Sequence, residues 1–340
     1  MSIRLHLISL LLWGLTAICG QAQRTVAPPQ ETQAPPQATQ APSQATQAPP
    51  LNIGDPAPPL RLRAWLKGEP IDKFEKGRVY AIEFWATWCK PCKAAMPHLS
   101  ALAHAYKNNV RIIGIDCYEQ KTMTPGRISA FVDSMGQRMD YKVATQDSDL
   151  MEVDWLRASG EQGIPKAFII NREGQVAWIG HPHELDKVLP EMVSDRWDIK
   201  QALADRNRKK YLDSLDGEVQ YELAPYRADP LKPDDPGKPD SALLALNDIL
   251  RKEPGLKYRS GFAANNFICL LKTNPQKAYE FGNEMLVAST YEDDLYGIIY
   301  GNIEAFSAKL HLSPEFSRLA AEAHQAQIDR YPGTDPLPAK

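Results

Sequence analysis

The feature that most constrains this chain is a pair of cysteines, separated by two residues, that directly follows an apolar segment. The sequence reads FWATWCKPC, with the pair at Cys89 and Cys92, between an expected strand at 79–85 and an expected helix at 94–106. A cysteine at the start of a helix meets unsatisfied backbone N–H groups and the positive end of the helix dipole, which favour the thiolate. Since one helical turn separates the two sulfurs, they are close enough to form an accessible disulfide. The motif therefore predicts a redox-active Cys89–Cys92 pair.

The residues between the cysteines support this interpretation. Pro91 has no backbone N–H to donate and fits only in the first turn of a helix. Lys90 adds a positive charge near the pair, which further favours the thiolate. We therefore predict that Cys89 is the attacking nucleophile and that Cys92 is the resolving thiol that releases the mixed disulfide.

Other readings of the cysteines and histidines stay open at this point. A Cys-X-X-Cys pair binds zinc when a second pair of ligands follows, but only Cys117, Cys269 and scattered histidines follow here. A permanently closed structural disulfide is the other alternative. Cys117 and Cys269 are expected to be buried, and a role for Cys117 as a third redox thiol is the alternative. His181 and His183 are interpreted as part of a surface turn. The residues thus indicate neither a metal nor another cofactor.

The N-terminal residues indicate export. A positively charged start, an apolar stretch at 7–18 and small residues after it are typical of a secretory signal peptide, with cleavage after Ala22. The apolar stretch is short for a membrane span, which needs about 20 residues. Lipidation of Cys19 is the alternative, although Ile18 stands where such a site needs a small residue. We predict a signal peptide at 1–22, a periplasmic or otherwise extracytoplasmic protein, and no stable membrane insertion after cleavage.

A low-complexity segment follows at 23–50. It contains three successive heptapeptides, PPQETQA, PPQATQA and PSQATQA, with no apolar seam. Pro, Gln, Ala and Thr bury too little surface to offset the entropy of chain ordering, so a disordered linker is predicted. The net charge of the whole chain is −3, which gives no basic field of the kind that collects nucleic acid.

The remainder divides into two regions, 51–195 and 196–340. In the first, strands are expected at 60–66, 79–85, 110–116, 141–144, 167–171 and 175–179, and helices at 94–106, 128–136 and 155–160. Strand–helix alternation that ends in a hairpin predicts an α/β fold with a central mixed sheet flanked by helices. In the second region, helices are expected at 197–222, 241–252, 258–272, 275–288, 293–309 and 314–330. Residues 196–340 are therefore predicted to form an all-α domain, whose role the sequence does not indicate.

Two motifs of the first region resemble the TlpA/ResA-like, exported branch of the thioredoxin family. FWATWCKPC is similar to the active-site segment of that family, and GIPKAFIINREGQVAWIGHP, at 163–182, to its cis-proline loop and terminal hairpin. The motifs stand in the family's order, about 70 residues apart. The resemblance covers 51–195 and implies a thioredoxin fold and protein disulfide oxidoreductase activity.

The resemblance also implies roles for single residues. Pro165 matches the cis-proline that faces the cysteines, which leaves the backbone of Ile164 free to pair with an extended substrate. Glu83 matches the buried acid that shuttles a proton for the resolving cysteine, and an apolar position should raise its pKa. The alternative is a glutamate that reaches solvent or pairs with a lysine. Lys166 stands where many relatives carry a small hydroxyl residue, and Ala95 where ResA-like relatives often carry a carboxylate.

The aromatic residues before the pair are expected to differ in role. Trp88 should flank the nucleophile as an exposed contact residue that binds substrate, whereas Phe84 and Trp85 should pack in the core. A peroxiredoxin, which shares the fold, needs Pro and Thr before its cysteine, and Ile82 and Ala86 stand at those positions instead. The match to that enzyme class therefore fails.

Together these features predict an exported enzyme that acts on protein thiols and disulfides. The thioredoxin-like residue before the proline and the buried glutamate favour the reductase direction, with an upstream membrane protein as electron donor. The alternative is that the helical region is a binding or adaptor module on a thioredoxin scaffold, with the redox role secondary.

Overall fold

The structure, a computed structural model, describes residues 50–227 and 237–331, which lie in one compact unit. The predicted signal peptide and the predicted linker up to residue 49 lie outside the described residues. Within the described ranges, no helix combines the length and the apolar character needed to cross a membrane.

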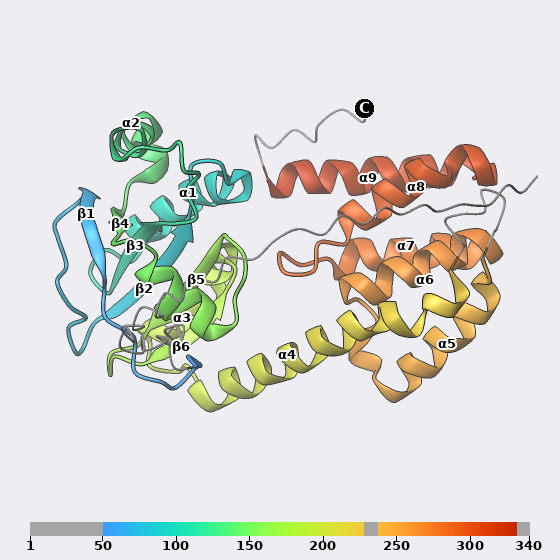
Figure 1. Cartoon of the computed structure of the whole chain (residues 1–340), viewed down its shortest axis with the longest axis horizontal. Helices are drawn as coiled ribbons and strands as arrows, with labels where there is room; N and C mark the ends of the chain where they lie inside the picture. The colour runs from blue at the N-terminus through green and yellow to red at the C-terminus, as the bar shows by residue number, and fades with distance from the viewer. Residues whose placement is uncertain (1–49, 228–236, 332–340) are drawn as a thin grey trace, which may run out of the picture. The chain divides into compact units, whose positions relative to one another are not determined.

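A six-stranded mixed sheet forms the centre of the first region (Figure 1). Its strands run in the order β1-β4-β3-β2-β5-β6, with β2, β3 and β4 parallel and the other pairs antiparallel. The strands are β1 (Leu62–Lys67), β2 (Val79–Trp85), β3 (Val110–Asp116), β4 (Lys142–Gln146), β5 (Lys166–Ile170) and β6 (Val176–Gly180). This confirms the predicted α/β fold with a central mixed sheet.

Strand β2 is buried along its whole length because helices cover both faces of the sheet. Its side chains alternate, with Val79 and Trp85 on one face and Tyr80 and Phe84 on the other. The first face packs against α1 (Lys90–Ala105), α2 (Pro125–Met135) and α3 (Leu185–Val193), and its cluster includes both cysteines of the pair, so we call it the cysteine face. The π-helix Glu152–Arg157 and the N-terminal segment cover the opposite face.

Helix α3 is not among the predicted elements, although its sequence carries the signal. Its buried residues follow an i, i+3, i+4, i+7 spacing, namely Leu185, Val188, Leu189 and Met192. Pro190 lies inside this short helix, and a proline in an apolar segment normally argues against one. Packing of the apolar residues on the cysteine face outweighs that local cost.

The second region is helical, from yellow to red in Figure 1. Its helices are α4 (Ile199–Glu222), α5 (Pro239–Lys252), α6 (Ser260–Thr273), α7 (Pro275–Ala288), α8 (Tyr296–Leu310) and α9 (Pro314–Arg330). The bounds of α7 and α9 coincide with the predicted ones. The start of α7 is well defined because the side-chain oxygen Oδ1 of Asn274 accepts a hydrogen bond from the Lys277 backbone N–H at 3.0 Å.

Helix α4 contributes to the cores of both regions. At its start, Ala202 packs with the opposite face of the sheet, and the indole N–H of the preceding Trp197 donates to the carbonyl of Ala177 at 3.0 Å. Near its end, Val219 is buried in a cluster of the helical region. The core of the sheet therefore continues beyond residue 195 into α4.

Gly114 on β3 has no room for a side chain. It lies opposite Glu83 of β2, and a Cβ atom at this position would lie 2.9 Å from Tyr141 Cε2 and 3.1 Å from Trp85 Nε1. Because both rings are packed in the core, we expect Gly114→Ala to lower the free energy of unfolding by about 1–3 kcal/mol in urea titrations. Gly126→Ala in α2 is the control, since nothing lies within 4 Å of its Cβ. Equal stability of the two variants would contradict this prediction.

Candidate active site

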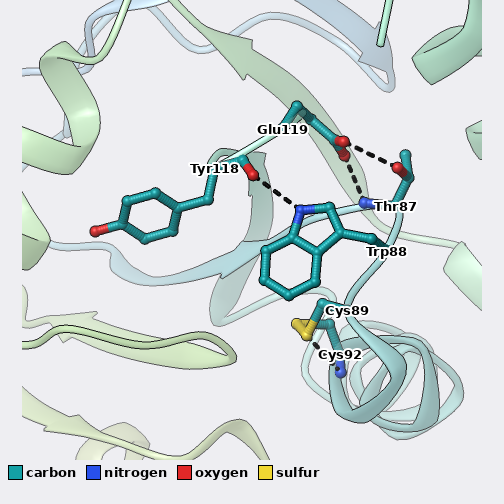
Figure 2. The surroundings of a disulfide bond; sticks show 6 residues. All are labelled: Thr87, Trp88, Cys89, Cys92, Tyr118 and Glu119. Carbon is teal, nitrogen blue, oxygen red and sulfur yellow. Dashed lines mark hydrogen bonds between the residues drawn. A yellow bond between two sulfur atoms is a disulfide. The ribbon is translucent and has the colours of Figure 1, made fainter. Parts of the chain in front are cut away.

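Helix α1 places the cysteine pair at its N-terminus. Cys89 is the N-cap residue, Pro91 lies in the first turn, and Cys89 and Cys92 form a disulfide with a Cα–Cα distance of 5.3 Å (Figure 2). The Cys92 backbone N–H donates to Cys89 Sγ at 3.2 Å. This N–H is one of the groups that a helix leaves unsatisfied at its start, so the Cys89 sulfur lies where a thiolate is stabilised.

The two cysteines and the residue before them differ in exposure. Cys92 is 0 % exposed and Cys89 is 2 % exposed, whereas Trp88 is 48 % exposed. Phe84 and Trp85 are fully buried, on opposite faces of the sheet. Trp88 is thus a large exposed side chain beside the pair, and Cys89 is slightly more exposed than Cys92.

A short segment after β3 holds the loop that precedes the cysteines. Thr87 donates from its backbone N–H and from its hydroxyl to the two carboxylate oxygens of Glu119, the latter at 2.9 Å (Figure 2). The indole N–H of Trp88 donates to the carbonyl of Tyr118 at 2.8 Å. Tyr118 and Glu119 are not among the site residues expected from the sequence. Their position directly after a strand was the available signal, because the carboxyl ends of parallel strands meet at one edge of a sheet.

Two further groups at the end of β3 are buried. Burial, and then the nearby carboxylates of Glu119 and Glu152, raise the pKa of Asp116 to about 9, so this carboxyl is neutral at pH 7. Burial also raises the pKa of the Cys117 thiol well above its ordinary value. Since Cys117 packs on the opposite face from the cysteine pair, the structure gives no support to a third redox thiol.

Glu83 lies on the cysteine face, because its neighbours Ile82 and Phe84 point to the opposite one. The residue is 1 % exposed, and neither carboxyl oxygen has a hydrogen-bond partner among the described residues. Burial raises the pKa of Glu83 well above its ordinary value. In the described part of the chain its carboxyl group neither reaches solvent nor pairs with a lysine.

The peptide bond between Ile164 and Pro165 is cis, as the resemblance implies. Lys166 follows directly and is buried, and it forms ion pairs with Glu161 at 3.0 Å and Glu292 at 2.9 Å. Glu292 belongs to the loop between α7 and α8. The lysine beside the cis-proline thus binds the helical region.

The interpretation of His181 and His183 as a surface turn is wrong for His181, which is 6 % exposed. Both rings stack on Tyr291, with centroid distances of 4.8 and 4.5 Å. Burial and the neighbouring histidine lower the pKa of His181 to about 3; burial and His98 lower that of His183 to about 4. Both are neutral at pH 7 and pack as aromatic rings. Within the described residues, no group of three or more His, Cys, Asp or Glu side chains could hold a metal ion.

Comparison with known proteins agrees with this geometry. The family model described as thioredoxin matches residues 71–131. The chain is 32 % identical over 154 residues to the protein FixW of Rhizobium leguminosarum, an alignment that covers 43 % of this chain and 68 % of FixW. The chain belongs to the thioredoxin family. Because Phe84 pairs with Lys166, the cis-proline and the CXXC motif of this thioredoxin-family protein lie at the same edge of the sheet.

Other thioredoxin-family relatives carry names that describe a reaction. The thiol–disulfide oxidoreductase ResA of Bacillus anthracis is 32 % identical over 113 residues, which cover 33 % of this chain and 60 % of ResA. The thiol:disulfide interchange protein HelX of Rhodobacter capsulatus is 26 % identical over 125 residues, 36 % of this chain and 64 % of HelX. A thiol–disulfide isomerase from Corynebacterium glutamicum matches with a TM-score of 0.36 and 18 % identity, over 42 % of this chain and 97 % of the isomerase. With its CXXC pair, this chain is a thioredoxin-like thiol–disulfide oxidoreductase.

Proposed function

We propose that this protein is an exported reductase of protein disulfides, with Cys89 as nucleophile and Cys92 as resolving thiol. The observation that carries the proposal is the position of Cys89 at the N-cap of α1, where its sulfur accepts a backbone N–H and borders the exposed Trp88. Lys90 and Pro91 would modulate the pair through charge and through the geometry of the first turn.

The reaction proceeds in two exchanges. The Cys89 thiolate attacks one sulfur of the substrate disulfide, forms a mixed disulfide and releases the other substrate sulfur as a thiolate. The Cys92 thiol then gives its proton to the Glu83 carboxylate, and the Cys92 thiolate attacks Cys89 Sγ. The Cys89–Cys92 disulfide forms, and the reduced substrate leaves as a thiolate. The disulfide in the structure is the product state of this half-reaction.

Substrate binding is assigned to Trp88, Ile164 and Pro165. Trp88 offers an exposed ring that is held in place by its hydrogen bond to Tyr118. Strand β5 begins immediately after Pro165, so an extended substrate can pair with the backbone of Ile164 at the end of the strand. Such pairing recognises backbone more than side chains, which suits an enzyme that acts on several protein substrates.

The cellular setting is also a proposal. The charged start and short apolar stretch of residues 1–22 support export to the periplasm or another extracytoplasmic space, where each turnover needs fresh electrons from an upstream membrane donor. We assign the thioredoxin-like domain to 51–195 and the helical domain to 196–340, with α4 packing against both. N-terminal mass spectrometry of the mature protein would show whether cleavage occurs after Ala22.

A second candidate function is supported by the loop between α7 and α8. Its Tyr291 and Glu292 contact His181, His183 and Lys166 next to the cis-proline. A helical region fixed at this place could act as a binding or adaptor module that presents partners to the thioredoxin domain. A wild-type protein that captures a partner but does not reduce insulin would favour this function over the enzyme.

The decisive experiment is to trap the mixed disulfide. Cys92→Ser leaves the Cys89 nucleophile but removes the resolving thiol, so it should accumulate covalent adducts with its substrates that dithiothreitol dissolves. Expression in the exported form, affinity purification and mass spectrometry would identify those substrates. The double variant Cys89→Ser/Cys92→Ser is the matched control. If the single variant retains no more reducible adducts than the double variant, the proposed reaction on protein disulfides is wrong.

A further inference from the structure

Three polar groups on the cysteine face have no hydrogen-bond partner among the described residues. They are the Glu83 carboxyl, the indole N–H of Trp85 and the phenol of Tyr141. All three side chains are buried. A buried polar group without a partner is destabilising, and native structures contain few of them. Three in one layer of the core therefore call for a functional explanation.

The three residues lie around one position, the missing side chain of Gly114. Gly114 is directly opposite Glu83 in the pairing of β2 with β3. The place that a Cβ would take on Gly114 is 2.9 Å from the Tyr141 ring and 3.1 Å from Trp85 Nε1. Trp85 also follows Glu83 by two residues on the same strand, so their side chains share a face. The glycine thus makes room for two rings beside the glutamate.

The hydrogen-bonding capacities of these groups are complementary. Tyr141 and Trp85 each have an N–H or O–H to donate, and a Glu83 carboxylate can only accept. Burial, and then the charge of Glu83, raise the pKa of Tyr141 well above its ordinary value, so its phenol keeps its proton. The structure contains the disulfide, the state in which the proposed reaction leaves Glu83 protonated. In that state Glu83 is not a carboxylate, so the donors of Tyr141 and Trp85 have no charged acceptor beside them.

We propose that Tyr141 and Trp85 are positioning residues that donate hydrogen bonds to the Glu83 carboxylate formed in the reduced enzyme, and so set the pH at which Glu83 can accept the proton of Cys92. The inference rests on the proposed role of Glu83 as the proton acceptor. No bond other than the S–H of Cys92 and the O–H of Glu83 changes in this step, and the proton that leaves sulfur arrives at the carboxylate.

The surroundings of Glu83 contain little else that could set this pH. Cys92 on α1 and its N-cap residue Cys89 belong to the buried cluster of the cysteine face. The other titratable residues of α1 are not buried: Lys90 and His104 are exposed, and Lys93 and His98 are half-buried. At the end of β3 stand Asp116 and Cys117, both with a raised pKa.

The strand on the other side of Glu83 is β5. There Glu83 lies opposite the apolar Ala167, and the Lys166 ammonium is bound to Glu161 and Glu292. Burial is the cause that raises the pKa of Glu83, and no cation of the described residues offsets it. Hydrogen bonds from Tyr141 and Trp85 are the remaining way to stabilise the carboxylate.

The test is the pH dependence of resolution in three variants. Pre-reduced protein is first converted at low pH to the mixed disulfide of Cys89 with an activated disulfide peptide. The rate at which Cys92 resolves this adduct is then followed after a jump to each pH from 5 to 9. Tyr141→Phe keeps the ring and removes only the hydroxyl, so the midpoint of the profile should move up by about one pH unit, a roughly tenfold lower rate on its acid side. Trp85→Phe should move it in the same direction. Tyr80→Phe is the matched control, because the Tyr80 hydroxyl lies on the opposite face and accepts from the Glu75 N–H.

The outcomes distinguish the positioning role of Tyr141 and Trp85 from the proton-acceptor role of Glu83 on which it rests. Glu83→Gln should remove the midpoint altogether; if it does not, the proton role of Glu83 is wrong. If Glu83→Gln removes the midpoint but Tyr141→Phe and Trp85→Phe leave it at the wild-type pH, Glu83 is the acceptor and the positioning role is wrong. Infrared titration of the Glu83 carboxyl in the reduced protein gives a second readout that does not depend on turnover, and it should show the same upward shift.

Discussion

Cys89→Ser is expected to lower the rate of insulin disulfide reduction in the presence of dithiothreitol to the uncatalysed rate, a loss of about a hundredfold or more. A serine hydroxyl does not attack a disulfide, and Cys92 cannot replace the lost sulfur because it is completely buried in the first turn of α1. Turbidity of the precipitating insulin chains measures the rate. Circular dichroism of the variant should be unchanged, since the exchange of sulfur for oxygen is small.

Cys117→Ala is the matched control for this result. Cys117 is as buried as the cysteine pair, but it packs on the opposite face of the sheet, and burial keeps its thiol protonated. We expect the variant to retain at least about half of the wild-type rate, because a small apolar residue replaces a small buried thiol. A folded Cys117→Ala protein without activity would show that the chemistry needs a third thiol and that the two-cysteine mechanism is wrong.

Glu292→Gln is expected to lower the free energy of unfolding at pH 7 by about 3 kcal/mol. The Glu292 carboxylate contacts the ammonium groups of Lys166 at 2.9 Å and Lys209 at 3.4 Å. Burial alone would raise the pKa of Glu292, but the two lysines outweigh it and lower the pKa to about 2. The neutral amide loses that attraction and leaves the buried Lys166 with Glu161 as its remaining ion-pair partner among the described residues.

The stabilising contribution of Glu292 should depend on pH in a definite direction. Because the pKa of Glu292 is lower in the folded protein than its ordinary value of 4.5, its contribution is present above about pH 4.5 and is lost as the pH falls towards 2. Urea unfolding should therefore separate the wild type from Glu292→Gln at pH 7 and bring them together only as the pH approaches about 2. Glu304→Gln, at an exposed position of α8, is the control and should match the wild type throughout. A difference that does not change with pH would indicate lost packing instead of a lost charge interaction.

The role of the helical region is better tested by point variants at its contact with the thioredoxin domain than by deletion. Helix α4 supplies Ala202 to the core of the sheet, and the nearby Trp197 binds β6. Deletion from residue 197 would therefore remove part of the thioredoxin core together with the helices. Point variants at Glu292 or Tyr291 weaken the contact beside the cis-proline and leave both cores intact, so they are the sharper test of a role in substrate selection.

Much of the fold could be predicted because its signals are local. Strands β2 and β3 coincide with continuous apolar runs, and α7 and α9 begin at prolines that cannot continue a preceding segment. The motif FWATWCKPC likewise places the cysteines at a helix start through residues that adjoin one another. The missed helix α3 shows the limit of this reasoning, since Pro190 is unfavourable locally and the packing that compensates for it is not local.

What the sequence by itself determined was the redox pair, its place at the start of α1 and the buried acid on the adjacent strand. Only the tertiary structure decided what surrounds them: the Glu119 carboxylate that holds Thr87, the rings of Tyr141 and Trp85 over Gly114, and the burial of His181 under Tyr291. The physical reason is the range of the interactions. A helix start or an apolar strand depends on residues within one or two turns, whereas these contacts depend on how distant segments pack across one sheet and one long helix.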